Sequence, residues 1–179
     1  MKTVALFGGS FDPPHIGHEH IVQRALEVEF IDKVIVMPTY LNPFKSQFHA
    51  PAEVRLQWLR EIFSSYKNVE VSDFEVKLQR KVPSIESVHF LLEKYKKVYL
   101  IIGADNLSSL SQWENYETLQ QLVTFLVAKR DGINIPNDYS VLEIEENISS
   151  TVLRKDLDKT KLPSSCKEEI FEFYKEKNG

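Results

Sequence analysis

Residues 3–18 read TVALFGGSFDPPHIGH, and this stretch determines most of what we expect of the fold. Its first part, residues 3–8, is short and apolar and ends at two glycines, which predicts a buried strand. Its last part opens a segment, residues 16–28, whose apolar side chains recur at helical spacing. The sequence therefore predicts a strand, a polar loop and a helix in immediate succession.

The rest of the chain repeats this alternation. Further strands are predicted at 33–37, 69–76, 98–102, 123–128 and 141–145. Helices are expected at 51–63, 84–95, 115–122, 151–157 and 165–177. Short strands that are apolar on both faces are typical of a parallel sheet covered on both sides. We therefore expect a single α/β domain over residues 1–179: a Rossmann-like, doubly wound, mainly parallel sheet with helices on both faces.

The overall composition argues against several classes of protein. The net charge is −4 and the lysines are interleaved with glutamates, which argues against a nucleic-acid polymer as partner. The single cysteine, Cys166, cannot form an internal disulfide and favours a reducing compartment. No apolar run approaches the roughly 18 residues of a membrane helix, and no small-residue cleavage site follows MKTVALFGG. We therefore expect a cytoplasmic protein with neither a membrane span nor a signal peptide.

The loop between the first predicted strand and helix carries the densest group of polar residues. In open α/β sheets, ligands bind at the carboxyl ends of strands, and a helix N-terminus there offers free N–H groups to an anion. His15 and His18 share one face of the first helical turn, and Gly17 between them keeps that face low. Two imidazoles and several N–H groups aimed at one point suit a phosphate, above all one that gains charge in a transition state.

Two other roles are open to these histidines. They could cap the helix or lie on its surface, or they could bind zinc together with His20. The zinc site is disfavoured because positions three and five residues apart point in different directions. Two familiar phosphate motifs are excluded, since the chain contains neither GxxxxGK[ST] nor GxGxxG.

Several segments, in order along the chain, carry a family resemblance. GGSFDPPHIGH at 8–18 resembles the HxGH signature of the nucleotidyltransferase superfamily, and ISSTVLR at 148–154 resembles its second signature. Between them, NPFK at 42–45 and IIGADNLSSLSQW at 101–113 resemble segments of bacterial nicotinate-nucleotide adenylyltransferases. The resemblance covers most of residues 2–157.

The resemblance implies a reaction and its substrates. The phosphate of nicotinate mononucleotide would attack the α-phosphorus of ATP, releasing pyrophosphate and forming deamido-NAD without a covalent enzyme intermediate. Magnesium would be carried with ATP, held largely by ligand oxygens and water, and no metal site is expected in the protein itself. The family pattern assigns catalysis to His15, His18 and Arg154. It assigns ATP binding to these three residues and to Gly8, Gly9, Ser10, Phe11, Gly103, Asp105, Ser150 and Thr151.

Physical chemistry agrees with the second signature. A serine–serine–threonine run is typical of a helix cap, and Arg154 falls three to four residues later on the same face. The planar fork of arginine suits phosphate oxygens. We expect this helix start to bind the outgoing phosphates.

The resemblance places the acceptor nucleotide on three further residues. Trp113 would stack on the pyridine ring, and Lys45 would reach a phosphate or the nicotinate carboxylate. Asn42 would position Lys45 or contact the substrate. Plainer alternatives are a core tryptophan, which is the role expected for Trp58, and a surface lysine.

Two charged residues follow the strands predicted at 98–102 and 123–128. Asp105 could accept hydrogen bonds from ribose hydroxyls or cap the next helix. Arg130 could contact a ligand or pair with an acid on the surface.

The chain departs from the family pattern at a point that concerns substrate choice. Relatives carry a Ser-Tyr-Thr turn that helps hold the nicotinate end, whereas residues 82–87 here read VPSIES. The sequence therefore does not rank nicotinate over nicotinamide mononucleotide, and it does not give the oligomeric state. Two other functions stay open: another adenylyltransferase, such as phosphopantetheine adenylyltransferase, and a nucleotide-binding sensor without catalysis.

Overall fold

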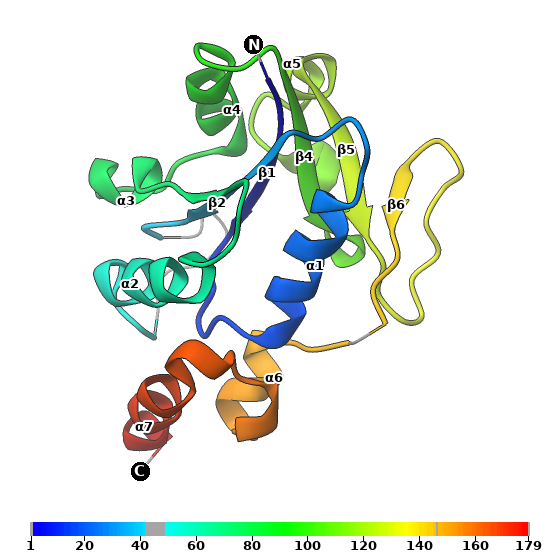
Figure 1. Ribbon diagram of the computed structural model, residues 1–179. Coiled ribbons are helices and arrows are strands. Elements are labelled where there is room, and N and C mark those ends of the chain that lie inside the picture. The colour runs from blue at the N-terminus through cyan, green and yellow to red at the C-terminus, as the bar shows by residue number, and fades with distance from the viewer. Residues whose placement is uncertain (1, 42–48, 146, 179) are drawn as a thin grey trace.

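The strands of the molecule form one six-stranded sheet in the order β3-β2-β1-β4-β5-β6 (Figure 1). The computed structural model describes residues 2–41, 49–145 and 147–178. The strands are β1 (Thr3–Gly9), β2 (Lys33–Pro38), β3 (Val69–Val71), β4 (Lys97–Gly103), β5 (Val123–Ala128) and β6 (Ser140–Leu142). Every neighbouring pair is parallel. The chain winds outward from β1 to β3 and then returns to β4 on the other side of β1, so the topological switch point lies between β1 and β4.

Helices cover both faces of this sheet. The α-helices are α1 (Ile16–Leu26), α2 (Ala52–Phe63), α3 (Phe74–Leu78), α4 (Ser84–Leu92), α5 (Tyr116–Leu122), α6 (Ser150–Lys155) and α7 (Lys167–Asn178). Short 3₁₀ helices are η1 (Ala104–Asn106), η2 (Leu110–Gln112), η3 (Lys159–Lys161) and η4 (Ser164–Cys166).

Alternate strand residues supply two separate cores. Ala5 and Phe7 of β1 pack in one core with Val22 of α1 and Leu59 of α2. Their neighbours on the strand, such as Leu6, pack in the other core, with residues of α4 and α5. This alternation is the reason that the strands read as continuously apolar.

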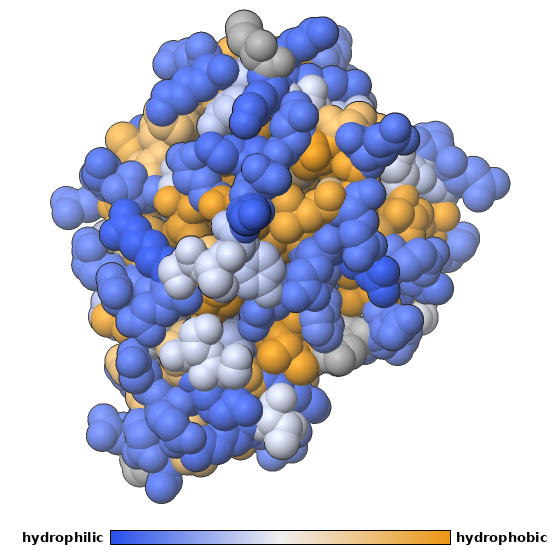
Figure 2. Space-filling view, viewed as in Figure 1, coloured by the Kyte–Doolittle hydropathy of each residue, from blue (hydrophilic) through white to orange (hydrophobic). Residues whose placement is uncertain are grey.

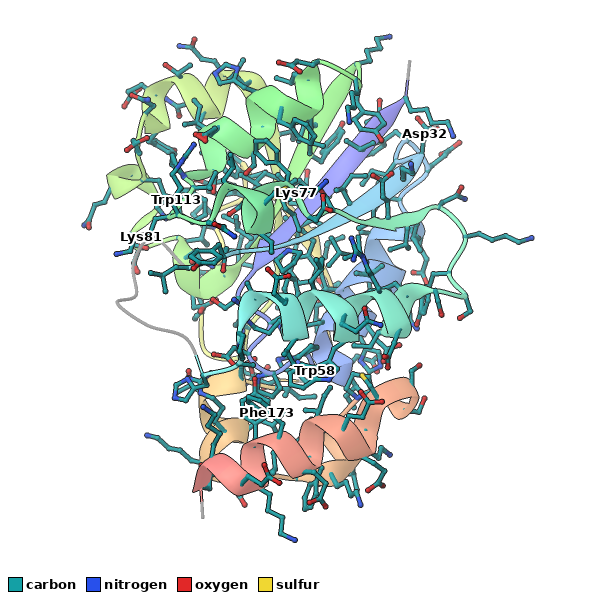
Figure 3. All side chains as sticks on the ribbon, turned by 90° about the vertical axis from the view of Figure 1, so that its left-hand side faces the viewer. Asp32, Trp58, Lys77, Lys81, Trp113 and Phe173 are labelled. Atoms are coloured by element: carbon teal, nitrogen blue, oxygen red, sulfur yellow. The ribbon has the colours of Figure 1, made fainter. Side chains whose placement is uncertain are left out.

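The C-terminal helices lie beyond the carboxyl ends of the strands, at the bottom of Figure 1. Ile170 and Tyr174 of α7 are buried in the same core as Trp58 of α2. The rings of Trp58 and Phe173 meet edge to face at 5.5 Å, and Figure 3 labels both. Trp58 is therefore a core residue, as expected, and α7 is packed onto the edge of the sheet where ligands bind in this fold.

The expected fold class is confirmed, and the sheet is parallel throughout. The strand expected at 69–76 was wrong in its second half: it stops at Val71, and residues 74–78 form α3. The Ser72 hydroxyl accepts a hydrogen bond from the Phe74 amide at 3.3 Å, which turns the backbone into the helix. The helix expected at 84–95 ends at Leu92, and the strand expected at 141–145 covers Ser140–Leu142.

The helices and the visible surface show how apolar side chains are distributed. In the part of the chain that the structure describes, no helix has both the length and the apolar character needed to span a bilayer. On the face seen in Figure 2, hydrophilic side chains separate smaller hydrophobic areas.

Candidate active site

The two histidines of the first loop lie together at the carboxyl end of β1. His15 is the N-cap residue of α1, and its ring stacks on that of His18 with centroids 3.7 Å apart. Phe11 supports the other side of His18 with the edge of its buried ring, 4.7 Å away. A Cβ at Gly17 would come within 2.9 Å of the His15 ring, so only glycine leaves room for this stack. The expected shared face of the two imidazoles is present.

Hydrogen bonding fixes the state of these imidazoles. The backbone N–H of His15 donates to Nδ1 of His18 at 3.1 Å. A neutral imidazole that accepts at Nδ1 carries its proton on Nε2, so His18 presents an N–H donor. Nδ1 of His15 is buried and has no hydrogen-bond partner within the described residues. A buried polar atom of this kind marks a position where a ligand or water belongs.

Both imidazoles are uncharged near neutral pH. Burial, followed by the charges of Arg130 and His20, lowers the pKa of His15 to about 3. Burial, followed by His15 and Arg130, lowers the pKa of His18 well below its ordinary value. An anion bound beside them would raise both pKa values, because an opposite charge favours the protonated form.

The start of α6 meets the β1–α1 loop across a long sequence separation. The Ser150 hydroxyl donates to the Pro13 carbonyl at 2.9 Å, and Arg154 donates to the Asp12 carbonyl and to the Thr151 hydroxyl. Ser149 caps the helix by accepting from the Val152 amide. The structure thus brings the segments 8–18 and 148–154 to one edge of the sheet.

Asp12 and its partners hold this loop in place. Its buried carboxylate accepts hydrogen bonds from the Tyr174 hydroxyl of α7 and from the backbone amides of His49 and Ala50. Burial acts to raise the pKa of Asp12, but these hydrogen bonds together with Arg154 bring it below its ordinary value. Asp12 is therefore a buried anion that ties the loop to two distant parts of the chain.

Arg55 of α2 also holds the loop between β1 and α1 in place. It lies on the buried side of α2 and is 1% exposed. Its guanidinium donates to four backbone carbonyls, at Ser10, Thr39, Tyr40 and Ala50, over 2.7–3.1 Å. Sequence reasoning missed this residue, although an arginine within the apolar stripe of a helix was a usable signal.

The ends of β4 and β5 contribute a charged pair. Nε of Arg130 lies 3.9 Å from Oδ1 of Asp105, and Arg130 also donates to the Ile148 carbonyl at 3.1 Å. Arg130 thus links Asp105, which the sequence assigned to ATP binding, to the segment that leads into α6.

A cavity of about 560 Å³ opens beside the histidine loop, at the switch point. Gly8 and Gly9 of β1 and Gly103 of β4 line it, and Trp113 lines it at the end of η2. Figure 3 shows Trp113 and Lys81, another lining residue, at the same margin of the molecule. Glu75 and Ser84, which sequence reasoning did not assign to the site, also line this cavity. Asn42 and Lys45, the remaining expected acceptor residues, lie outside the described residues.

The chain was compared with known proteins. A family model described as cytidylyltransferase-like matches residues 6–156. A protein of Sulfurimonas denitrificans named probable nicotinate-nucleotide adenylyltransferase is 57% identical over 178 residues, covering 99% of this chain and 98% of that protein. A protein of Nitratiruptor sp. with the same name is 52% identical over 174 residues, covering 96% and 98%.

The fold also matches solved structures. Plasmodium falciparum nicotinic acid mononucleotide adenylyltransferase, complexed with NaAD, superposes with a TM-score of 0.76 at 21% identity, covering 99% of this chain and 97% of that one. The matched residues 6–156 include both segments that meet at the carboxyl edge of the sheet. The family model and the full-length identities show that the chain belongs to the cytidylyltransferase-like family of nucleotidyltransferases and, within it, to the nicotinate-nucleotide adenylyltransferases.

Proposed function

We propose that this protein transfers the adenylyl group of ATP to nicotinate mononucleotide. A phosphate oxygen of the acceptor forms a bond to the α-phosphorus of ATP, the bond from that phosphorus to the pyrophosphate breaks, and deamido-NAD is the product. One observation supports the proposal beyond the family: the loop that carries the histidine pair meets the start of α6, and Gly8 and Gly9, which lead into this loop, line the cavity at the switch point.

The phosphate end of the site, residues 8–18 and 150–154, stabilises the reacting phosphates. His18 offers an N–H donor at Nε2 and the start of α1 offers backbone amides, and donors of this kind stabilise charge that develops on a phosphate. Ser150, Thr151 and Arg154 bind the departing β- and γ-phosphates from the other side. Because these groups are fixed by packing before ATP arrives, little reorganisation is needed in the transition state.

The acceptor end of the site is the cavity wall formed by Glu75, Lys81, Ser84 and Trp113. Trp113 offers an aromatic face to the pyridine ring. Pro83 and Ser84 begin α4 and line the cavity, so the N-terminal amides of that helix face an acidic ring substituent. Glu86 lies in the first turn of α4, and both of its carboxylate oxygens accept hydrogen bonds from Arg80 at 2.7–2.8 Å. This pairing offsets a negative charge that would otherwise oppose an anionic acceptor.

Magnesium enters as part of the substrate, on the triphosphate of ATP. Across residues 2–41, 49–145 and 147–178 there is no group of three or more His, Cys, Asp or Glu side chains that could hold a metal ion. The general chemistry of Mg²⁺ supports the proposal that it is carried by ATP, because Mg²⁺ is commonly bound through substrate phosphates and water.

Product analysis tests the proposal. Purified protein with ATP, magnesium and nicotinate mononucleotide should release pyrophosphate and form deamido-NAD in equal amounts. Parallel reactions with phosphopantetheine and with no acceptor distinguish this activity from the two alternatives, another adenylyltransferase and a nucleotide-binding sensor without catalysis. Faster turnover of phosphopantetheine, or ATP binding without pyrophosphate release from either acceptor, would contradict the proposal.

A further inference from the structure

The charges that line the cavity do not match an acidic acceptor. Two carboxyl groups, of Glu75 and Glu114, and one ammonium group, of Lys81, are among the lining side chains. Nicotinate mononucleotide carries a carboxylate as well as its phosphate. Two ionised carboxylates in the wall would repel it in a site shielded from water.

Glu75 is the deeper of the two carboxyl groups. Its residue is 5% exposed, whereas Glu114 lies on the surface. The Ser87 hydroxyl of α4 donates to Oε2 of Glu75 at 2.9 Å. Within the described residues, this is the one hydrogen bond that the Glu75 carboxyl group makes, and Oε1 is left to the cavity.

The surroundings favour the protonated form of this carboxyl group. Burial raises the pKa of Glu75 to about 8, the Ser87 hydrogen bond opposes this, and Glu86 adds to it. Nearby charges are largely paired with one another. The charged or titratable groups on the elements around Glu75 are Asp73 and Lys77 of α3, Glu53, Arg55, Arg60 and Glu61 of α2, Arg80, Lys81, Glu86 and His89 before and in α4, and Glu114 across the cavity.

We propose that Glu75 is a specificity-determining residue of the acceptor end: held by Ser87, its carboxyl group keeps its proton and donates a hydrogen bond from Oε1 to the pyridine carboxylate of the acceptor. When the proton is lost, the same oxygen repels that carboxylate and accepts from the N–H groups of an amide instead. Glu75 therefore selects the acid over the amide at neutral pH. This inference rests on the proposed function.

The test is the ratio of kcat/KM for nicotinate mononucleotide to kcat/KM for nicotinamide mononucleotide, measured with ATP from about pH 6 to about pH 9.5. Both acceptors share the ribose and the phosphate, and the nicotinate carboxylate stays ionised throughout. The ratio therefore cancels titrations of the histidines, of ATP and of the acceptor phosphate. We expect the ratio to fall about tenfold to a hundredfold across this range, the value of a hydrogen bond to a charged group.

Two variants make the assignment. Glu75→Gln keeps an N–H donor and cannot ionise, so its ratio should not fall with pH. Glu75→Leu lacks a donor, so its kcat/KM ratio should be lower than that of the wild type at neutral pH and should not change with pH. Glu114→Gln is the matched control, because it removes the other carboxyl group of the wall and should keep the wild-type decline.

A second readout does not depend on turnover. Since the folded state prefers protonated Glu75, the wild type should lose thermal stability relative to Glu75→Gln as the pH rises from about 5 to about 9. Three results would overturn the inference while leaving the proposed function intact. They are a wild-type kcat/KM ratio that does not change with pH, a decline of this ratio that persists in Glu75→Gln, and the same pH dependence of thermal stability in the wild type and in Glu75→Gln. If the folded wild type forms no product from nicotinate mononucleotide at any pH, both fail.

Discussion

At the phosphate end of the site, burial holds the imidazoles of His15 and His18 without protons; at the acceptor end, burial holds the carboxyl group of Glu75 with its proton. The two imidazoles at one end and the Glu75 carboxyl group at the other are thus uncharged before substrates bind, for the same physical reason and with opposite pH dependence. Triphosphate binding favours protonation of the histidines, whereas raising the pH ionises Glu75. The comparison shows that burial removes the charge of two basic groups at one end of the site and of an acidic group at the other.

The two ends also differ in how they are built. The phosphate end rests on β1, α1 and α6, and hydrogen bonds join α6 directly to the loop between β1 and α1. The acceptor end is formed by short elements, α3 and η2, and by the start of α4. Changes at the first end should affect chemistry, and changes at the second should affect acceptor binding.

The largest effect is expected from His18→Ala. If its N–H group stabilises the reacting phosphates, turnover should fall roughly 10²–10⁴-fold. Pyrophosphate release under saturating substrates measures this, with circular dichroism to verify the fold. His20→Ala, in the same helix, should stay within about twofold. Equal losses in the two variants would contradict a specific role for His18.

Arg55→Met tests the support beneath the phosphate end. Four carbonyls, which are buried or partly buried, lose their donor and Asp12 loses a nearby positive charge, so the free energy of unfolding should fall by about 3–5 kcal/mol. Urea unfolding measures the change. Arg60→Met is the control: this exposed arginine pairs with Asp73 on the surface and should contribute at most about 1 kcal/mol. Similar losses in the free energy of unfolding for Arg55→Met and Arg60→Met would mean that the hydrogen bonds of Arg55 do not stabilise the loop.

The two tryptophans distinguish acceptor binding from packing. Trp113→Ala should raise KM for the acceptor about tenfold to a hundredfold through lost stacking, and should change KM for ATP far less. Trp58→Phe is the matched variant in the core beside Phe173; it should lower stability without raising KM for the acceptor. A rise in KM that is the same for both substrates of Trp113→Ala would place this side chain outside the acceptor end.

The smallest effect concerns acid stability at the phosphate end. The lowered pKa of buried His15 means that the unfolded chain binds a proton below about pH 6.5 that the folded chain does not. The stability from His15 is full above this pH and decreases as the pH falls toward about 3, by about 1 kcal/mol between pH 6.5 and 5.5. Chemical unfolding at the two pH values should show a smaller decrease in His15→Gln. A decrease of the same size in the variant would assign the effect to other groups.

Local patterns predicted the phosphate end well. The strand, the loop and the first turn of α1 are adjacent in sequence, so helical spacing alone put His15 and His18 on one face. Local patterns could not predict the residues that hold this loop in place, because Arg55 and Tyr174 contact it from 45 and 162 residues away in the sequence. Asp12 stood in the quoted motif, yet its role depends on those distant partners.

The acceptor end was less accessible to sequence reasoning. Alternation through residues 69–76 predicted one strand, but the apolar positions change phase between Val71 and Phe74, at a Ser-Asp pair typical of a helix start. This misassignment hid Glu75, since on a strand it would have been read as a solvent-facing residue. Trp113 was assigned to the acceptor site through the family resemblance, and it lines the cavity.

The hydrogen bond between Tyr174 and Asp12 joins two residues that are 162 positions apart in the sequence. While the chain is still emerging from the ribosome, the loop that carries His15 and His18 lacks this support, even though its strand and helix are already complete. The loop therefore reaches its supported position only after α7 has been synthesised and has packed against it. Removal of the final helix by a protease or a premature stop codon should impair an enzyme whose catalytic signatures are all still present.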